Sequence, residues 1–225
     1  MPATTPTPAG APATLTVPDV AAWRAWLDAH EADSDGVWLV LAKKGVTDPT
    51  SLTYAEALDE ALCSGWIDGQ RRGGDATTFR QRFVPRRARS LWSQRNVEHV
   101  ARLVAEGRMR ERGQAEVDRA RADGRWERAY AGQASAEVPA DLLAALDAVP
   151  GARARFDALG RQQRYAVLHP LMTAPGDAVR AARLERAVRA LSAPGDGGVP
   201  GDGGAPGVAD APQVGDAPGG DLGRS

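Results

Sequence analysis

The pattern of hydrophobic and polar positions is most informative in residues 51–96, where it predicts a helix, two strands and the start of a second helix. Thr53 is followed three residues later by Glu56, which is the spacing of a capping box, so we expect a helix to begin at Tyr54. The apolar side chains of this helix share one face and are Leu58, Ala61 and Leu62. Gly65 stands where a left-handed residue commonly ends a helix, which predicts the end of this one.

Strands are expected on both sides of this helix in the sequence. Residues 66–69 (Trp-Ile-Asp-Gly) follow it and predict a short buried strand. Residues 77–84 alternate with the period of two that is typical of a strand. One face of that strand holds Thr77, Phe79, Gln81 and Phe83, and the other holds Arg80 and Arg82. Residues 37–44 are apolar on both faces, which favours a central strand covered on both sides.

Helical spacing accounts for most of the remaining apolar positions. Asp19 is expected to cap a first helix, and Ser93 a later one that ends near Gly107. The chain beyond Gly107 is helical in pattern, with an interruption at Pro170. We therefore expect an α+β fold, in which a small antiparallel sheet flanked by helices is followed by a C-terminal helical part.

The same pattern divides the chain into four segments. Residues 1–14 carry too little apolar content to pack and are expected to be a disordered N-terminus. Residues 15–107 should form the α+β domain, and residues 108–192 a helical region packed on it. Residues 193–225 are rich in Gly, Pro and Asp, with a proline at every sixth position from 194 to 218, and are expected to be a disordered acidic tail.

Positive charge is concentrated in one part of the chain. The formal net charge is −1, yet residues 71–95 contain eight arginines and a single acidic residue, Asp75. The one cysteine, Cys63, excludes an internal disulfide and fits a reducing compartment. No signal-peptide pattern is present, and no apolar run is long enough for a transmembrane segment. We therefore expect a cytoplasmic protein.

The arginines before Ser93 form the strongest candidate site. Arg86, Arg87 and Arg89 precede a helix start, whose free N–H groups and dipole attract anions, and Arg82 lies in the strand before them. These side chains predict a site for an anionic ligand. The alternative is a solvated basic surface, or one neutralised by nearby carboxylates, namely those of Glu56, Asp59 and Glu60.

Two further candidates, Trp66 and Asp68, lie in the predicted strand at residues 66–69. Trp66 is expected in the core, with a stacking platform for a ligand as the alternative. A carboxylate beside a buried Trp-Ile pair needs a donor. We expect Asp68 to pair with an arginine (Arg71, Arg72 or Arg82), with a role as general base as the alternative.

The sequence indicates no metal site, no cofactor and no catalytic constellation. His30, His99 and His169 are isolated and lack metal-ligand spacing. Neither a glycine-rich phosphate loop nor a serine nucleophile elbow is present. Cys63 lies beside an apolar helix face, which is typical of a small buried hydrophobic residue, with a reactive thiol as the alternative.

Two runs of sequence carry a family resemblance: SLTYAEALDEALCSGWIDGQRR at residues 51–72 and QRFVPRRARSLWSQRNVEHVARL at residues 81–103. Together they resemble the bacterial YdeI/OmpD-associated family, also labelled bacteriocin-protection proteins. The resemblance extends over about residues 26–191 and includes Gly124-Arg125-Trp126, residues 138–142 and residues 179–184. It implies a link to envelope stress and to resistance against cationic antimicrobial peptides, and it assigns no catalytic residue.

Three functions follow as hypotheses. The first is a stress-protection protein without enzymatic activity, which binds an anionic small molecule or an envelope-related protein through the arginine-rich surface. The second is an enzyme that acts on an anionic small molecule near Asp68. The third is a nucleic-acid binder, which the near-zero net charge and the acidic tail argue against.

Overall fold

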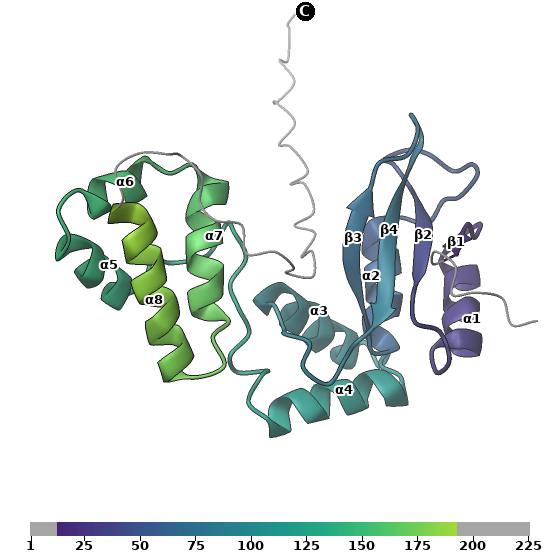
Figure 1. Cartoon of the computed structure of the whole chain (residues 1–225). Helices are drawn as coiled ribbons and strands as arrows, with labels where there is room; N and C mark the ends of the chain where they lie inside the picture. Colours follow the sequence, from purple (N-terminus) through teal and green to yellow (C-terminus); the bar gives the residue numbers. More distant parts are fainter. Residues whose placement is uncertain (1–12, 193–225) are drawn as a thin grey trace, which may run out of the picture.

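The structure is a computed structural model that describes residues 13–192. The tail and all but the end of the N-terminal segment predicted to be disordered lie outside the described residues. Within residues 13–192 the chain forms one mixed sheet and eight helices in two side-by-side units (Figure 1).

The first unit contains the sheet and four helices. Its strands are β1 (Thr14–Leu15), β2 (Val37–Ala42), β3 (Trp66–Arg72) and β4 (Thr78–Pro85). Its helices are α1 (Val20–His30), α2 (Tyr54–Cys63), α3 (Gln94–Ala105) and α4 (Glu111–Ala122). The described strands lie in the order β1-β2-β4-β3. The neighbouring pairs β2–β4 and β4–β3 are antiparallel, as predicted, whereas β1 runs parallel to β2, so the sheet is mixed.

One face of the sheet forms the first hydrophobic core. In β4, Phe79, Gln81 and Phe83 point to this face, and Arg80 and Arg82 to the other, as the alternation predicted. α1 and α2 pack on the core face, and α3 and α4 pack against α2. The fully buried side chains at the centre of this core include Trp23, Leu27, Leu39, Leu58 and Trp66.

Two predicted strands differ from the observed ones. β3 continues to Arg72, and only its first residue, Trp66, is buried, because β3 lies at the edge of the sheet. β2 ends at Ala42 and not at Lys44. It is central, as expected, and on its outer face the guanidinium of Arg72 covers the Trp38 ring at 4.2 Å.

The second unit is a bundle of the helices α5 (Ala140–Asp147), α6 (Ala152–Ala158), α7 (Arg161–Met172) and α8 (Asp177–Ser192). It has its own core, built around Leu142, Leu146, Phe156 and Leu168. Pro170 was expected to interrupt a helix, but α7 passes through it. Proline at this position removes one backbone hydrogen bond, and the burial of Leu168 and Leu171 on the same helix offsets this loss.

The connection between the units is tied to both. Tyr130 exchanges two backbone hydrogen bonds of 2.9 Å with the start of α3: its N–H donates to the Trp92 carbonyl, and its carbonyl accepts from Gln94. On the other side its ring packs edge-on against His169, and the Tyr165 hydroxyl donates to the Ala131 carbonyl at 3.0 Å. The first core includes α4 and extends to Ala129, and the second begins at Ala136. The two hydrophobic cores are therefore separated by residues 130–135.

Candidate functional site

Arg86 is the most unusual polar residue of the first unit. Arg86 follows the last residue of β4, and its backbone N–H donates to the Gly65 carbonyl at 3.0 Å. Its side chain points into the domain, and the residue is only 6% exposed. The guanidinium lies 3.5 Å from the centre of the Trp92 ring, and Nη1 donates to the Leu91 carbonyl at 3.1 Å. Nε and Nη2 are buried and have no acceptor among the described residues.

These two nitrogens form the edge of a guanidinium that binds a carboxylate or phosphate with two parallel hydrogen bonds. Removal from water lowers the pKa of Arg86 to about 9, although the negative charge of Asp68 opposes this shift. Arg86 is therefore a buried cation that retains two donors for an anion.

Asp68 lies on β3, close to Arg86. Its Oδ2 accepts a 2.8 Å hydrogen bond from the hydroxyl of Tyr54, the first residue of α2. Burial raises the pKa of Asp68, and the bond from Tyr54 and the charges of Arg86 and Arg95 partly oppose this effect. Burial of the Tyr54 hydroxyl, together with the negative charge of Asp68, raises the pKa of Tyr54. Asp68 is thus a half-buried carboxylate held by a tyrosine.

Asp68 and Arg86 interact without direct contact. Asp68 is the carboxylate with the strongest electrostatic effect on Arg86, and Arg86 is the cation with the strongest effect on Asp68. Their side chains do not form an ion pair with each other, and neither residue forms a salt bridge with any other part of residues 13–192. We refer to Tyr54, Asp68, Arg86 and Trp92 together as the Arg86–Asp68 site.

The arginines around this site also lack acidic partners. None of the eight arginines in residues 71–95 forms an ion pair within the described part of the chain. Arg71 lies 4.0 Å above the Phe79 ring, Arg87 and Arg89 are exposed, and Arg82 donates weakly to the Asp35 carbonyl. No ion pair within the described residues therefore neutralises the positive charge of this segment.

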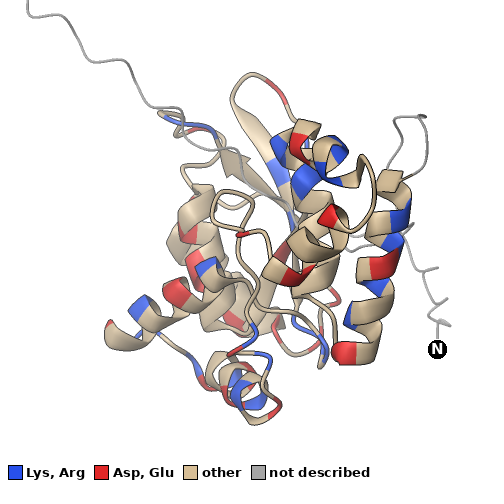
Figure 2. Ribbon diagram, turned by 90° about the vertical axis from the view of Figure 1, so that its left-hand side faces the viewer, with Lys and Arg blue, Asp and Glu red and all other residues tan. Residues whose placement is uncertain are grey.

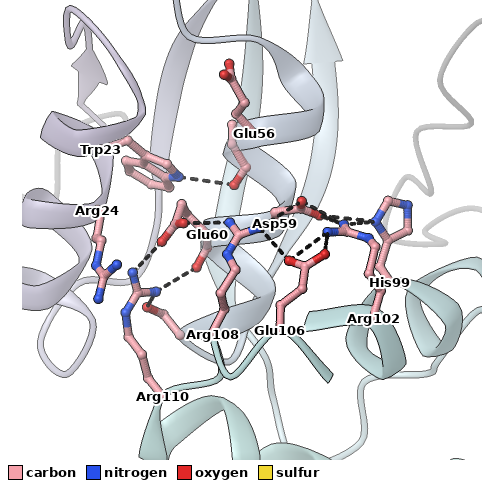
Figure 3. Close-up of polar contacts among 12 residues, drawn as sticks. Trp23, Arg24, Glu56, Asp59, Glu60, His99, Arg102, Glu106, Arg108 and Arg110 are labelled. Atoms are coloured by element: carbon pink, nitrogen blue, oxygen red, sulfur yellow. Dashed lines mark hydrogen bonds and ion pairs between the residues drawn. The ribbon is translucent and has the colours of Figure 1, made fainter. Parts of the chain in front are cut away.

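The carboxylates considered as neutralising partners are used elsewhere (Figure 3). Glu56 completes the capping box with Thr53. Asp59 accepts two hydrogen bonds of 2.7 Å from Arg102, and the buried Glu60 pairs with Arg108 and Arg110. This network joins α2 to α3 and to the start of α4. A similar interleaving of positive and negative residues along the helices is visible in Figure 2.

The other predicted site residues are distributed differently from the expected cluster. Ser93 caps α3 by accepting from the Asn96 N–H at 3.2 Å, and the Gln94 N–H is bound by Tyr130, so the protein itself uses donors of this helix start. Trp66 is fully buried against Trp26. The remaining three, Arg82, Arg87 and Arg89, lie outside the Arg86–Asp68 site: Arg82 is on the opposite face of the sheet from Asp68, and Arg87 and Arg89 face solvent.

Two members of the site, Tyr54 and Trp92, were not among the predicted site residues. The capping box placed Tyr54 at the start of α2, but its bond to Asp68 joins two elements that meet only in the folded chain. The expected arginine partner of Asp68 is not found within the described residues: Arg71, Arg72 and Arg82 make no ion pair with it.

The Cys63 thiol, a metal site and a membrane span were also considered as functional features, and Cys63 is buried in the first core. Burial raises the pKa of the Cys63 thiol to about 11, which disfavours the thiolate. Residues 13–192 contain no group of three side chains that could hold a metal ion. In the same part of the chain, no helix combines the length and the apolar character needed to cross a membrane.

A groove of about 350 Å³ lies in the second unit, away from the Arg86–Asp68 site. It is lined by Pro139, by the turn between α7 and α8, and by two arginines, Arg128 and Arg180. Arg180 pairs with Asp141, so part of its charge is neutralised. This groove offers polar and apolar surface in similar amounts, and none of its lining residues has a buried free donor comparable to that of Arg86.

Two family models match the chain. Residues 135–193, which contain α5 to α8, match the model described as Bacteriocin-protection, YdeI or OmpD-Associated (OmdA). The match to the YdeI/OmpD-associated domain is thus confined to the second unit. Residues 15–116 match a domain of unknown function (DUF8412), which covers the sheet and the Arg86–Asp68 site.

The two matches refine the resemblance found in the sequence. The runs at residues 51–72 and 81–103 lie in the domain of unknown function, whereas residues 138–142 and 179–184 lie in the YdeI/OmpD-associated domain. No curated protein and no solved structure gives a significant match.

Proposed function

We propose that this YdeI/OmpD-associated protein is a stress-protection protein that binds a small anionic ligand at the Arg86–Asp68 site, within its arginine-rich segment. The observation that carries the proposal is the free edge of Arg86: two adjacent, buried N–H donors without an acceptor among the described residues. The family match supports the protective role.

The energetics favour an anion at this position. A buried donor without an acceptor costs roughly 1–3 kcal/mol, and a buried cation without a counter-ion adds a desolvation cost. An anion bound at Nε and Nη2 relieves both. The unpaired arginines nearby, among them Arg71 and Arg95, increase the local concentration of anions and speed their association.

Isothermal titration calorimetry with inorganic phosphate tests the proposal, together with thermal unfolding in phosphate and in chloride at matched ionic strength. We expect phosphate to bind the wild type and to raise its Tm along the saturation curve of a ligand that binds only the folded state. Arg86→Lys keeps the charge but loses the two-donor edge, and should remove most of the binding.

The double variant Arg87→Gln with Arg89→Gln is the matched control. It removes two exposed charges beside the site and should retain phosphate binding, with a weaker dependence on salt. The proposal is wrong if phosphate does not bind the wild type, or if the Arg86→Lys variant binds phosphate as tightly as the wild type.

An enzymatic role for Asp68 is a second candidate, supported by one observation. A half-buried carboxylate with a raised pKa, 2.8 Å from a tyrosine hydroxyl and near a cation that can hold an anion, has the features of a general base. Incubation of the purified protein with a panel of phosphate esters tests this role. Turnover that is lost in Asp68→Asn but not in the exposed control Asp75→Asn would support it.

A further inference from the structure

The Arg86–Asp68 site combines a donor edge with an acceptor. Arg86 offers the N–H groups of Nε and Nη2. The Asp68 carboxylate accepts from Tyr54 at Oδ2 and from its own backbone N–H, while Oδ1 receives no hydrogen bond from another described side chain and keeps the capacity to accept one from a ligand. We propose that the site selects anions that carry a proton, such as hydrogen phosphate or a phosphate monoester in its singly protonated form, over fully deprotonated anions such as sulfate. This inference rests on the anion binding proposed above.

The position of Asp68 carries the argument. Its backbone pairs with Phe83 of β4, three residues before Arg86, and its charge interacts with that of Arg86 although the two side chains do not touch. An anion held by the Arg86 edge therefore lies within electrostatic range of a carboxylate. Two like charges at such a distance repel each other strongly where the surroundings exclude water.

A proton on the bound anion turns the repulsion between the anion and Asp68 into an attraction. An anion O–H group can donate to Oδ1 of Asp68, and a hydrogen bond with a charged acceptor is short and strong. Sulfate has no proton to donate and leaves the repulsion in place. A site built to accept a hydrogen bond from its ligand discriminates against a ligand that lacks the donor. We expect phosphate to bind at least about tenfold more tightly than sulfate.

Tyr54 is a positioning residue in this scheme. Its hydroxyl donates to Oδ2 and so fixes the carboxylate, which leaves Oδ1 for the ligand. The charged groups that act on this pair are Arg71 of β3, Arg86 after β4 and Arg95 of α3. All three are cations. Glu116 of α4 also acts on Arg86, but more weakly than Asp68, so Asp68 is the carboxylate that we expect to accept a hydrogen bond from the anion.

Calorimetry with phosphate and with sulfate, in chloride buffer of matched ionic strength at about pH 8, tests the selectivity, because hydrogen phosphate keeps one proton under these conditions. In Asp68→Asn the amide can donate to sulfate, and the ratio of the two affinities should fall to less than about threefold. The control Asp75→Asn, an exposed carboxylate that binds its own loop, should keep the wild-type ratio.

If the Asp68→Asn variant does not fold, the wild type supplies a second test. Protonation of Asp68 at acidic pH turns the acceptor into a donor, so sulfate should bind more tightly as the pH falls from about 8 to 5. Equal binding of phosphate and sulfate at every pH would overturn the selectivity and leave the anion site standing. Absence of binding by either anion would instead refute the anion site itself.

Discussion

Gly113 provides the sharpest test of how α4 packs on α2. Gly113 is buried, and a Cβ atom added to it would lie 2.1 Å from the Cys63 carbonyl oxygen and 2.9 Å from that of Leu62. Real Cβ atoms keep at least 3.0 Å from such atoms, so α4 would have to move by roughly 0.9 Å. The movement would strain the Arg110 N–H bond to the Cys63 carbonyl and the Arg110–Glu60 pair.

The expected effect of Gly113→Ala combines two opposing contributions. Alanine in place of glycine stabilises a helix by up to about 1 kcal/mol, whereas overpacking of a core costs about 1–3 kcal/mol and occasionally more. Because the predicted overlap is with backbone atoms, we expect the second contribution to dominate. The net loss should be about 2 kcal/mol, which lowers the Tm of a domain of this size by about 4–8 °C.

Urea unfolding followed by circular dichroism measures this loss, with Gly73→Ala as the control. A Cβ at Gly73 meets no atom within 4 Å, and this glycine has no positive φ, so its variant should unfold within about 0.5 kcal/mol of the wild type. A Gly113→Ala protein as stable as the wild type, or more stable, would show that α4 does not contact the end of α2 as described.

Three further predictions concern single side chains. Trp66→Ala should destabilise the fold by about 3–5 kcal/mol, as truncation of a fully buried aromatic does, and a wild-type urea midpoint would contradict it. Because the pKa of Cys63 is raised to about 11, native protein should react with iodoacetamide only at the rate of its opening, and fast labelling without unfolding would contradict the buried thiol. Burial lowers the pKa of His169 below 6.5, so the unfolded chain binds the proton more tightly and stability is lost as the pH falls below that value. His169→Phe should reduce the drop in Tm between about pH 7 and 5, and an unchanged drop would place that titration on other groups.

Local signals in the sequence were sufficient for the ends of several helices. The capping box of Thr53 and Glu56 is present with both of its hydrogen bonds, and Ser93 accepts from the N–H three residues later. Gly65 follows α2 with a φ of 73°. Each of these features depends on residues within one turn of helix, so the sequence contains all the information needed to predict it.

The candidate site required contacts that no local pattern encodes. Three arginines close in sequence, Arg86, Arg87 and Arg89, look equivalent in a linear reading, yet only Arg86 is buried, because the Trp92 ring and the Leu91 carbonyl receive it. The bond from Tyr54 to Asp68 spans 14 residues and depends on how α2 packs against β3. The short strand β1 likewise exists only through its pairing with β2.

Because β3 lies at the edge of the sheet, its arginines also affect how separate molecules of the protein interact, without any ligand. β3 is the last strand of the described sheet beside β4, and its register is irregular between Asp68 and Arg71. Charged side chains and irregular register at a free edge prevent the strand of another molecule from adding to the sheet. Arg71 and Arg72 therefore help to keep separate molecules of this protein from joining edge to edge. This consequence holds whether or not an anion binds at the Arg86–Asp68 site.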